Sequence, residues 1–204
     1  MKMKLYSSMT SPYSRKVRVV AEELGLADLI EEVMTDPFNP PPEFLAANPM
    51  SKIPTLITEK DEALPDSKLI VEYLQTRGHG VTSLPRGTKR WTALRRGQIA
   101  EGIIDAAVAT VFEKRRPEGI VYTTFLDRQV VVIRRSLDIL NLESSALVQN
   151  GPVSIVEITA GVALAYLDLR MPYVEWRKNH DELAAWYEVF AQRPSMIKTQ
   201  PPVA

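Results

Sequence analysis

Apolar positions in the first part of the chain alternate between two spacings, one typical of strands and one typical of helices. Residues 3–7 form a short apolar run that predicts a strand. Apolar side chains then recur at i, i+3, i+4 and i+7 over residues 17–24, which is the spacing of an amphipathic helix. In that helix Arg15, Arg18 and Glu22 are expected to point away from the apolar face.

The pattern then continues with shorter elements. The further predicted strands are residues 29–34, 54–58 and 62–64. The proline-rich segment 36–42 is expected to be a loop, because consecutive prolines interrupt regular hydrogen bonding. Asp66 and Ser67 begin a second helix. This order predicts a small α/β sheet with helices packed against it.

Beyond residue 87 the strand pattern is absent and long helical patterns replace it. The predicted helices are residues 88–115, 118–142, 154–170 and 181–192. The segment 80–87 has the glycine and proline content of a linker. The expected organisation is therefore an α/β domain over residues 1–79, a linker over 80–87 and an all-α domain over 88–204.

The composition excludes several kinds of chemistry. The chain has 25 lysines and arginines against 25 aspartates and glutamates, so it lacks the basic excess of a nucleic-acid-binding protein. It has no cysteine, which excludes disulfides, thiolate-bound metals and a cysteine nucleophile. His79 and His180 are far apart and neither has metal-ligand spacing around it, so we expect no metal site.

No segment predicts membrane insertion or export. The most apolar stretch, residues 155–169, contains two carboxylates and is too short to span a bilayer, so it predicts a buried helix. The first residues do not develop an apolar run of signal-peptide length. We therefore expect a cytoplasmic protein with no membrane partner.

Hydroxyl side chains lie where the first predicted helix begins, in the segment Thr10-Ser11-Pro12. The N-terminus of a helix offers free N–H groups and the positive end of the helix dipole, which together stabilise an anion such as a thiolate. The alternative is that Ser11 only caps its helix, and spacing alone favours that simpler role.

Two further motifs lie at the start of predicted elements: Ile53-Pro54 at a strand, and Asp66-Ser67 at a helix. If the Ile53–Pro54 bond is cis, the backbone of Ile53 faces outward and can pair with a peptide-like ligand, although spacing alone favours an ordinary trans bond. Asp66 and Ser67 would suit an α-amino acid headgroup, with the ammonium on Asp66 and the carboxylate at Ser67 and the helix end. A plain capping pair is the simpler alternative.

The fourth motif is structural. Ser154 and Glu157 have the spacing of a capping box, in which a serine and a glutamate satisfy the first N–H groups of a helix reciprocally. This motif predicts the start of a buried helix and carries no chemistry.

Taken together and in this order, the four motifs resemble the cytosolic glutathione S-transferase family of the bacterial kind, with a serine-type active site. The resemblance extends over essentially the whole chain. It implies a thioredoxin-like N-terminal domain that binds glutathione as co-substrate, an all-α C-terminal domain, a cis Ile53–Pro54 bond and a homodimer. No other cofactor is implied.

The resemblance also implies roles for individual residues. Ser11 matches the hydroxyl that activates the glutathione sulfur, and Thr10 is its competitor because some classes use the preceding residue. The glutathione-binding positions are Lys52, Ile53, Pro54, Asp66 and Ser67. In these roles Lys52 lies near the glycine carboxylate, Ile53 pairs with the cysteinyl backbone, and Asp66 and Ser67 hold the γ-glutamyl headgroup.

The function implied is conjugation of glutathione to small hydrophobic electrophiles, in detoxification. Candidates for the electrophile pocket, expected between the domains with the all-α domain contributing, are Tyr13, Ile103, Phe112, Arg116, Tyr166 and Arg170. Core packing is the alternative for the apolar ones, and the two arginines would favour anionic or carbonyl-bearing substrates. Other glutathione-dependent reactions, namely peroxide reduction, dehalogenation, isomerisation or ether cleavage, remain alternatives, as does a non-catalytic ligand-binding or interaction protein.

Overall fold

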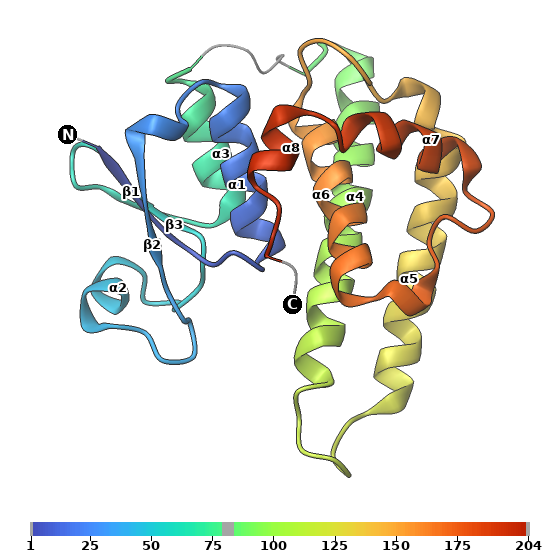
Figure 1. Ribbon diagram of the computed structural model, residues 1–204, viewed down its shortest axis with the longest axis horizontal. Helices are drawn as coiled ribbons and strands as arrows, with labels where there is room; N and C mark the ends of the chain where they lie inside the picture. The colour runs from blue at the N-terminus through green and yellow to red at the C-terminus, as the bar shows by residue number, and fades with distance from the viewer. Residues whose placement is uncertain (1, 79–83, 203–204) are drawn as a thin grey trace. The chain divides into compact units, whose positions relative to one another are not determined.

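The computed structural model describes residues 2–78 and 84–202 (Figure 1). These residues form two compact units. The first unit comprises residues 2–78 together with 193–202, and the second comprises residues 84–192. Part of the expected linker 80–87, along with His79, lies outside the described residues.

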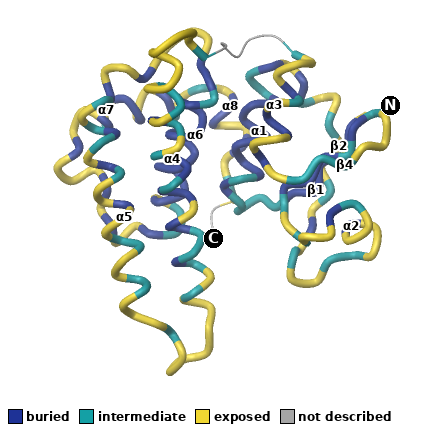
Figure 2. Tube along the Cα trace, turned by 180° about the vertical axis from the view of Figure 1, so that it is seen from behind, coloured by how far each residue is buried: buried dark blue, intermediate teal, exposed yellow. Residues whose placement is uncertain are grey.

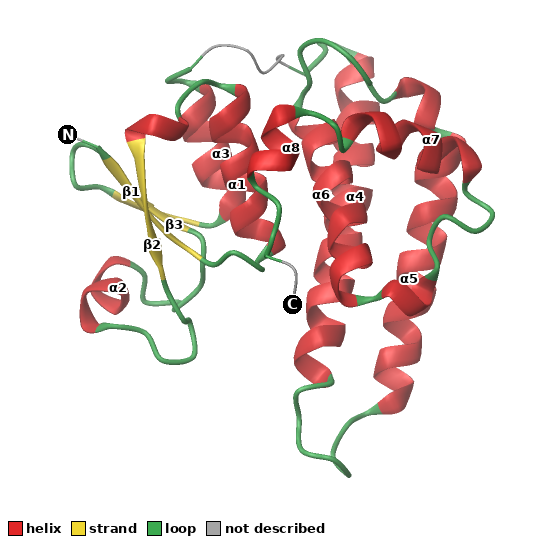
Figure 3. Cartoon of the chain, in the orientation of Figure 1, coloured by secondary structure: helices red, strands yellow, loops and turns green. Residues whose placement is uncertain are grey.

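A mixed four-stranded sheet forms the first unit (Figure 3). Its strand order is β2-β1-β3-β4, with bounds Ile30–Met34, Met3–Ser7, Thr55–Ile57 and Ala63–Pro65. β1 pairs in parallel with β2, whereas β3 is antiparallel to both β1 and β4. The predicted α/β sheet is confirmed.

Helices complete the first unit. Their bounds are α1 Pro12–Glu23, α2 Pro42–Ala47 and α3 Ser67–Gln75, with a 3-10 turn η1 at Ala27–Leu29. The apolar stripe predicted for α1 is buried, because Val17 and Val20 have no exposed surface, and α1 packs against α3. Phe44 of α2 packs on Tyr6 of β1, with ring centroids 5.1 Å apart.

The charged residues of α1 correct the sequence prediction. Arg15 and Arg18, expected to point away from the core, are only 7% and 6% exposed. Arg15 donates to the carbonyl of Met196 at 3.0 Å and to the hydroxyl of Thr199 at 3.5 Å. Arg15 is therefore buried because polar partners from the C-terminal segment lie against α1, whereas the partners of Arg18 are Met9 and Glu32.

The C-terminal segment packs with the first unit. Its short helix α8, Pro194–Lys198, contacts α1. Arg193 donates two hydrogen bonds to the carboxylate of Glu23, at 2.9 and 2.8 Å, and Lys198 pairs with Glu22 at 2.9 Å. The sequence analysis grouped these residues with the helical domain because pairs so distant in sequence leave no periodic signal.

The second unit is a helical bundle. Its helices are α4 Thr88–Glu113, α5 Thr123–Leu142, α6 Ile155–Arg170 and α7 Asp181–Phe190, with 3-10 turns η2 Ser144–Ala146 and η3 Pro172–Val174. Residues 84–192 contain no strand. The predicted fold class, an α/β unit and an all-helical unit, is thus confirmed.

Helix α6 is the centre of the bundle, and Figure 2 shows it buried along most of its length. Its capping box is formed as predicted: the Glu157 carboxylate accepts from the Ser154 amide at 2.8 Å, and the Ser154 hydroxyl accepts from Val156. Gly161 allows Phe190 to approach, since a Cβ there would lie 2.3 Å from the ring. No helix among the described residues is long and apolar enough to cross a membrane.

Candidate functional site

The register of the sheet brings the predicted motifs to one edge. Tyr6 near the end of β1 lies opposite Thr55 at the start of β3, and Thr55 lies opposite Pro65 at the end of β4. The chain therefore leaves β1, enters β3 and leaves β4 at the same end of the sheet. The segments that carry Ser11, Ile53–Pro54 and Asp66 follow or precede these strand ends directly.

Two helices also begin at this edge. Ser11 is the N-cap of α1 and its side chain accepts from the Ser14 amide at 3.2 Å. Asp66 is the N-cap of α3 and its carboxylate accepts from the Lys68 amide at 2.7 Å. Two helix N-termini with their free N–H groups make this end of the sheet favourable for an anionic ligand.

The hydroxyl of Ser11 serves the helix as an acceptor, which leaves its own hydrogen to donate elsewhere. Ser11 and Thr10 are both half-buried and both lie in the loop between β1 and α1. The hydroxyl of Ser14, one turn into the helix, is buried without a hydrogen-bond partner among the described residues. The capping role predicted for Ser11 is confirmed, and its role toward a thiol stays a prediction.

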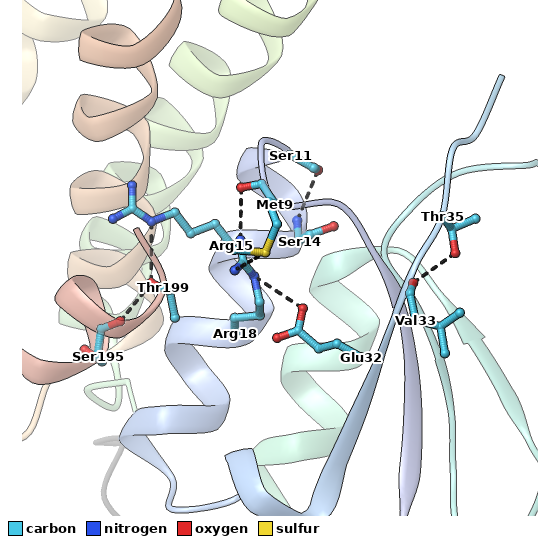
Figure 4. A network of polar contacts seen from close by, with 10 residues as sticks. All are labelled: Met9, Ser11, Ser14, Arg15, Arg18, Glu32, Val33, Thr35, Ser195 and Thr199. Carbon is cyan, nitrogen blue, oxygen red and sulfur yellow. Dashed lines mark hydrogen bonds and ion pairs between the residues drawn. The ribbon is translucent and has the colours of Figure 1, made fainter. Parts of the chain in front are cut away.

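The buried side chain of Arg18 bonds to the loop between β1 and α1. Figure 4 shows Arg18 reaching Met9 and Glu32. Its Nη2 donates to the carbonyl of Met9 at 3.2 Å, its Nη1 lies 3.4 Å from the Met9 sulfur, and its Nε lies 3.8 Å from the carboxylate of Glu32. Burial lowers the pKa of Arg18 and the Glu32 carboxylate partly offsets this effect. Arg18 thereby fixes the turn that presents Thr10 and Ser11.

The loop before β3 has the expected cis bond between Ile53 and Pro54. Asn48, which is fully buried, organises this loop by donating to the carbonyl of Lys52 and to the hydroxyl of Thr55, both at 2.9 Å. Lys52 is exposed and Ile53 is half-buried. The loop therefore has a defined backbone with an accessible cation beside it.

Asp66 adopts an unusual backbone conformation, with φ 74°. A non-glycine residue pays a steric cost there, and such residues concentrate at ligand sites. Its neighbour Ser67 is 3% exposed, whereas Asp66 is exposed to solvent. The structure confirms the capping role of Asp66, and its role toward a headgroup stays a prediction.

The candidates in the helical unit differ in their surroundings. Ile103 is fully buried and belongs to the core. The side chain of Arg116 is 56% exposed and pairs with Glu113 at 2.9 Å, so it is not the unpaired arginine that the sequence suggested. Phe112 is 48% exposed. In the first unit, Tyr13 is half-buried, with the Lys16 ammonium 6.0 Å from its ring centre.

Tyr166 and Arg170 of α6 lie together. Tyr166 is 7% exposed, and its burial raises the pKa of its phenol. The charges of Arg170 and Arg115 and a hydrogen bond with Arg170 act in the opposite direction, but burial is the larger effect. The Nε of Arg170 is buried without a hydrogen-bond partner among the described residues. The sequence analysis missed Arg115, since a charged residue after a helix end is normally a solvated one.

Three remaining observations concern His180, metal-binding groups and a cavity in the helical unit. His180 is buried, with Nδ1 2.7 Å from the carbonyl of Trp176 and Nε2 3.0 Å from Asp138. Within residues 2–78 and 84–202, no group of three or more histidine, cysteine, aspartate or glutamate side chains could hold a metal ion. A cavity of about 400 Å³ lies between the starts of α4 and α6, and its lining includes Arg96 and Glu157. Arg96 is paired with Glu143, and Glu157 is part of the capping box with Ser154.

Comparisons with known proteins agree on one family. Residues 10–77 match the model of the glutathione S-transferase N-terminal domain, and residues 123–188 match that of the C-terminal domain. The chain is 32% identical to the uncharacterized GST-like protein YibF of Escherichia coli K12, over 99% of this chain and 100% of that protein.

Solved structures of glutathione transferases are similar over the full length. A family member from Pseudomonas fluorescens Pf-5 with bound glutathione is 38% identical, with a TM-score of 0.90 over 99% of this chain and 100% of that one. A second structure, with bound S-(propanoic acid)-glutathione, is 36% identical, with a TM-score of 0.86 over 100% of this chain and 99% of that one.

Proposed function

Since the chain belongs to the glutathione S-transferase family, we propose that it is a serine-type glutathione transferase of the bacterial kind. It binds glutathione at the edge of the first unit's sheet and conjugates it to small hydrophobic electrophiles. The observation that carries this proposal is the meeting of two helix N-termini with the cis Ile53–Pro54 loop at one sheet edge. Glutathione bound in a relative 38% identical supports it.

Each part of glutathione finds matching chemistry at this edge. Its ammonium pairs with the carboxylate of Asp66, and its γ-glutamyl carboxylate docks at Ser67 and the start of α3. The backbone of Ile53, held next to Pro54, pairs with the cysteinyl residue as an added strand would. The exposed ammonium of Lys52 attracts the glycine carboxylate.

The chemical task is to ionise a thiol near neutral pH. A free thiol has a pKa of about 8.5, so only a few per cent is thiolate at pH 7. A hydrogen bond donated by Ser11 and the positive end of α1 both favour the charged form. Lowering the thiol pKa by about two units requires about 2.7 kcal/mol and makes the thiolate the main species.

The thiolate then attacks an electrophilic carbon. With an aryl halide, a sulfur–carbon bond forms, the carbon–halogen bond breaks and the halide leaves with its electron pair. Ser11 donates a hydrogen bond throughout and is not the nucleophile. The S-substituted glutathione bound in a relative 36% identical supports a site that also holds such a product.

We also propose a homodimer with a role in detoxification in the cytoplasm. Large apolar side chains that such an interface would cover are exposed in each unit, namely Phe38 at 69%, Met50 at 54% and Trp91 at 70%. Exposed apolar groups of this size favour association.

The first test compares Ser11→Ala with Thr10→Ala. Losing one hydrogen bond to a charged sulfur lowers kcat with a generic aryl halide by about 10- to 100-fold in Ser11→Ala. Thr10→Ala is the matched control and loses less, while circular dichroism shows that both variants remain folded. The reverse order would assign the thiol contact to Thr10.

The second test concerns the headgroup. Asp66→Ala removes the partner of the ammonium and is expected to raise KM for glutathione about tenfold or more, with a smaller effect on kcat. Asp61→Ala, another exposed aspartate with a positive φ, is the control. An unchanged KM in Asp66→Ala would place the headgroup elsewhere.

Retention on immobilised glutathione separates the remaining alternatives. Binding together with turnover of an aryl halide supports the transferase. Binding without turnover of an aryl halide, a peroxide or a dehalogenation substrate would instead identify a non-catalytic ligand-binding protein.

A further inference from the structure

The loop between β1 and α1 carries a methionine whose sulfur lies against a buried cation. The Nη1 of Arg18 is 3.4 Å from the sulfur of Met9, and Figure 4 shows this contact beside the hydrogen bond to the Met9 carbonyl. Both residues belong to the first unit. Because a thioether sulfur is a weak acceptor, Nη1 has only a weak partner in this contact.

The guanidinium of Arg18 has room for a stronger acceptor. It is 6% exposed, and its Nε has no hydrogen-bond partner among the described residues, since the carboxylate of Glu32 is 3.8 Å away. Burial lowers the pKa of Arg18, and the charge of Glu32 offsets only part of this effect. A buried cation with unpaired N–H groups costs free energy, which a new polar partner would reduce.

Oxidation of the methionine sulfur supplies such an acceptor. A lone pair of the sulfur attacks hydrogen peroxide, the sulfur–oxygen bond forms and the oxygen–oxygen bond breaks. The second peroxide oxygen leaves with the bonding electrons and takes the proton of the transferred oxygen, which gives water. The sulfur is thereby oxidised by two electrons to a sulfoxide and the peroxide is reduced. The sulfoxide is polar, and its oxygen accepts hydrogen bonds better than the thioether sulfur does.

Met9 differs from the other methionines in its surroundings. It is half-buried, so part of the residue is accessible to a small oxidant while its sulfur contacts Arg18. Elsewhere in the described ranges, three methionines are buried and two are exposed, namely Met3, Met171 and Met196 in the first group and Met34 and Met50 in the second. Since the chain has no cysteine, its methionines are the only sulfur side chains that peroxide can oxidise.

We propose that Met9 is an oxidation site at which hydrogen peroxide lowers the activity of the thiol site. The inference rests on the proposed function, because Met9 directly precedes Thr10 and Ser11 in the loop that Arg18 holds. A sulfoxide oxygen that accepts from the guanidinium needs more room than the contact of 3.4 Å leaves, so the bonds that fix this turn change. A displacement of the reacting groups by about 1 Å is enough to reduce the catalytic rate.

The test follows kcat and the oxidation state of Met9 together. The full chain is treated with hydrogen peroxide, the peroxide is removed, and mass spectrometry of peptides measures the sulfoxide at each methionine. The kcat of the wild type with an aryl halide is expected to fall about tenfold, in step with the fraction of Met9 that is oxidised. A wild-type protein that keeps its kcat with Met9 fully oxidised would overturn the proposal.

Two variants separate Met9 from the other methionines. Met9→Leu keeps the backbone carbonyl that Arg18 binds and a side chain of similar volume, so it should retain kcat through the same peroxide treatment. The double variant of Met34→Leu and Met50→Leu removes the two exposed sulfur atoms and should lose kcat as the wild type does. An equal loss in Met9→Leu and the wild type, or a Met9 that stays reduced while Met34 and Met50 are oxidised, would also overturn the proposal.

A measurement without turnover separates this inference from the proposed function. If the untreated protein neither binds glutathione in calorimetry nor turns over an aryl halide, the transferase proposal fails. The bond between the sulfoxide of Met9 and Arg18 is then tested by NMR of the guanidinium, whose resonances are assigned with Arg18→Lys. A shift on oxidation in the wild type that is missing in Met9→Leu supports the oxidation site. No shift in the wild type, or the same shift in both proteins, contradicts it.

Discussion

At the scale of single residues, Arg18 is the side chain whose role the sequence pattern conceals. Its position on the polar side of an amphipathic spacing predicted exposure, yet it is 6% exposed and bonded to the carbonyl of Met9. Periodicity assigns charges to solvent because it contains no information about partners from other elements. The caps at Ser11 and Asp66, in contrast, were predictable because capping is decided by neighbours in the chain.

Arg18 is a positioning residue, since it acts on the loop that carries Ser11. Arg18→Met should lower kcat about tenfold, raise the pKa of the bound thiol and change KM for glutathione less than about threefold. Arg18→Lys should recover part of kcat because an ammonium can donate to the Met9 carbonyl. A variant whose loss lies wholly in KM, with the thiol pKa unchanged, would contradict this role.

At the scale of elements, the strands and long helices followed the hydrophobic pattern, but two short helices did not. α2 begins at Pro42, within the segment expected to be a loop, and α8 follows the last predicted helix. Both have five or six residues, too few for a periodic signal. α8 owes its place to side chains that meet α1 across 170 or more positions of sequence.

The pair of Arg193 with Glu23, which joins the C-terminal segment to α1, is sensitive to acid. Burial opposes the ionisation of Glu23, but hydrogen bonds from Arg193 and Ser195 outweigh it, and the net effect lowers the pKa of Glu23. The folded state therefore binds this proton less readily than the unfolded state. The stabilisation is fully present above the ordinary carboxyl pKa of about 4.3 and is lost as pH falls through the lowered value.

Glu23→Gln should accordingly cost about 2 kcal/mol of unfolding free energy near pH 7, measured by urea denaturation. The difference from the wild type should shrink at about pH 3, because below the ordinary carboxyl pKa the unfolded wild-type chain takes up the proton that the folded state binds less readily. Glu22→Gln, which removes only an exposed pair with Lys198, should cost less than about 1 kcal/mol. An equal loss at both pH values would show that Glu23 acts through packing and not through its charge.

At the scale of the whole molecule, an α/β part followed by a helical part was predictable from the change in periodicity. The convergence of Ser11, Ile53 and Asp66 at one sheet edge was not, because strand order and register depend on pairings between distant segments. The resemblance to the glutathione S-transferase family implies that arrangement without the register.

The proposed assembly and ligand make a joint prediction for the intact protein. Light scattering should give twice the chain mass at micromolar concentration. Glutathione at about 100 times its dissociation constant should add about 2.7 kcal/mol of stability, seen as a higher Tm. The increase should be smaller in Asp66→Ala at the same concentration, and a Tm independent of glutathione would contradict binding to the folded state.

The proposed mechanism depends on the ionisation of the bound thiol. Ultraviolet difference titration of the protein–glutathione complex measures it, because the thiolate absorbs where the thiol does not. We expect a thiol pKa about two units below the value of about 8.5 for a free thiol, moving back toward that value in Ser11→Ala. Bound glutathione that titrates as it does in buffer would contradict the proposed mechanism.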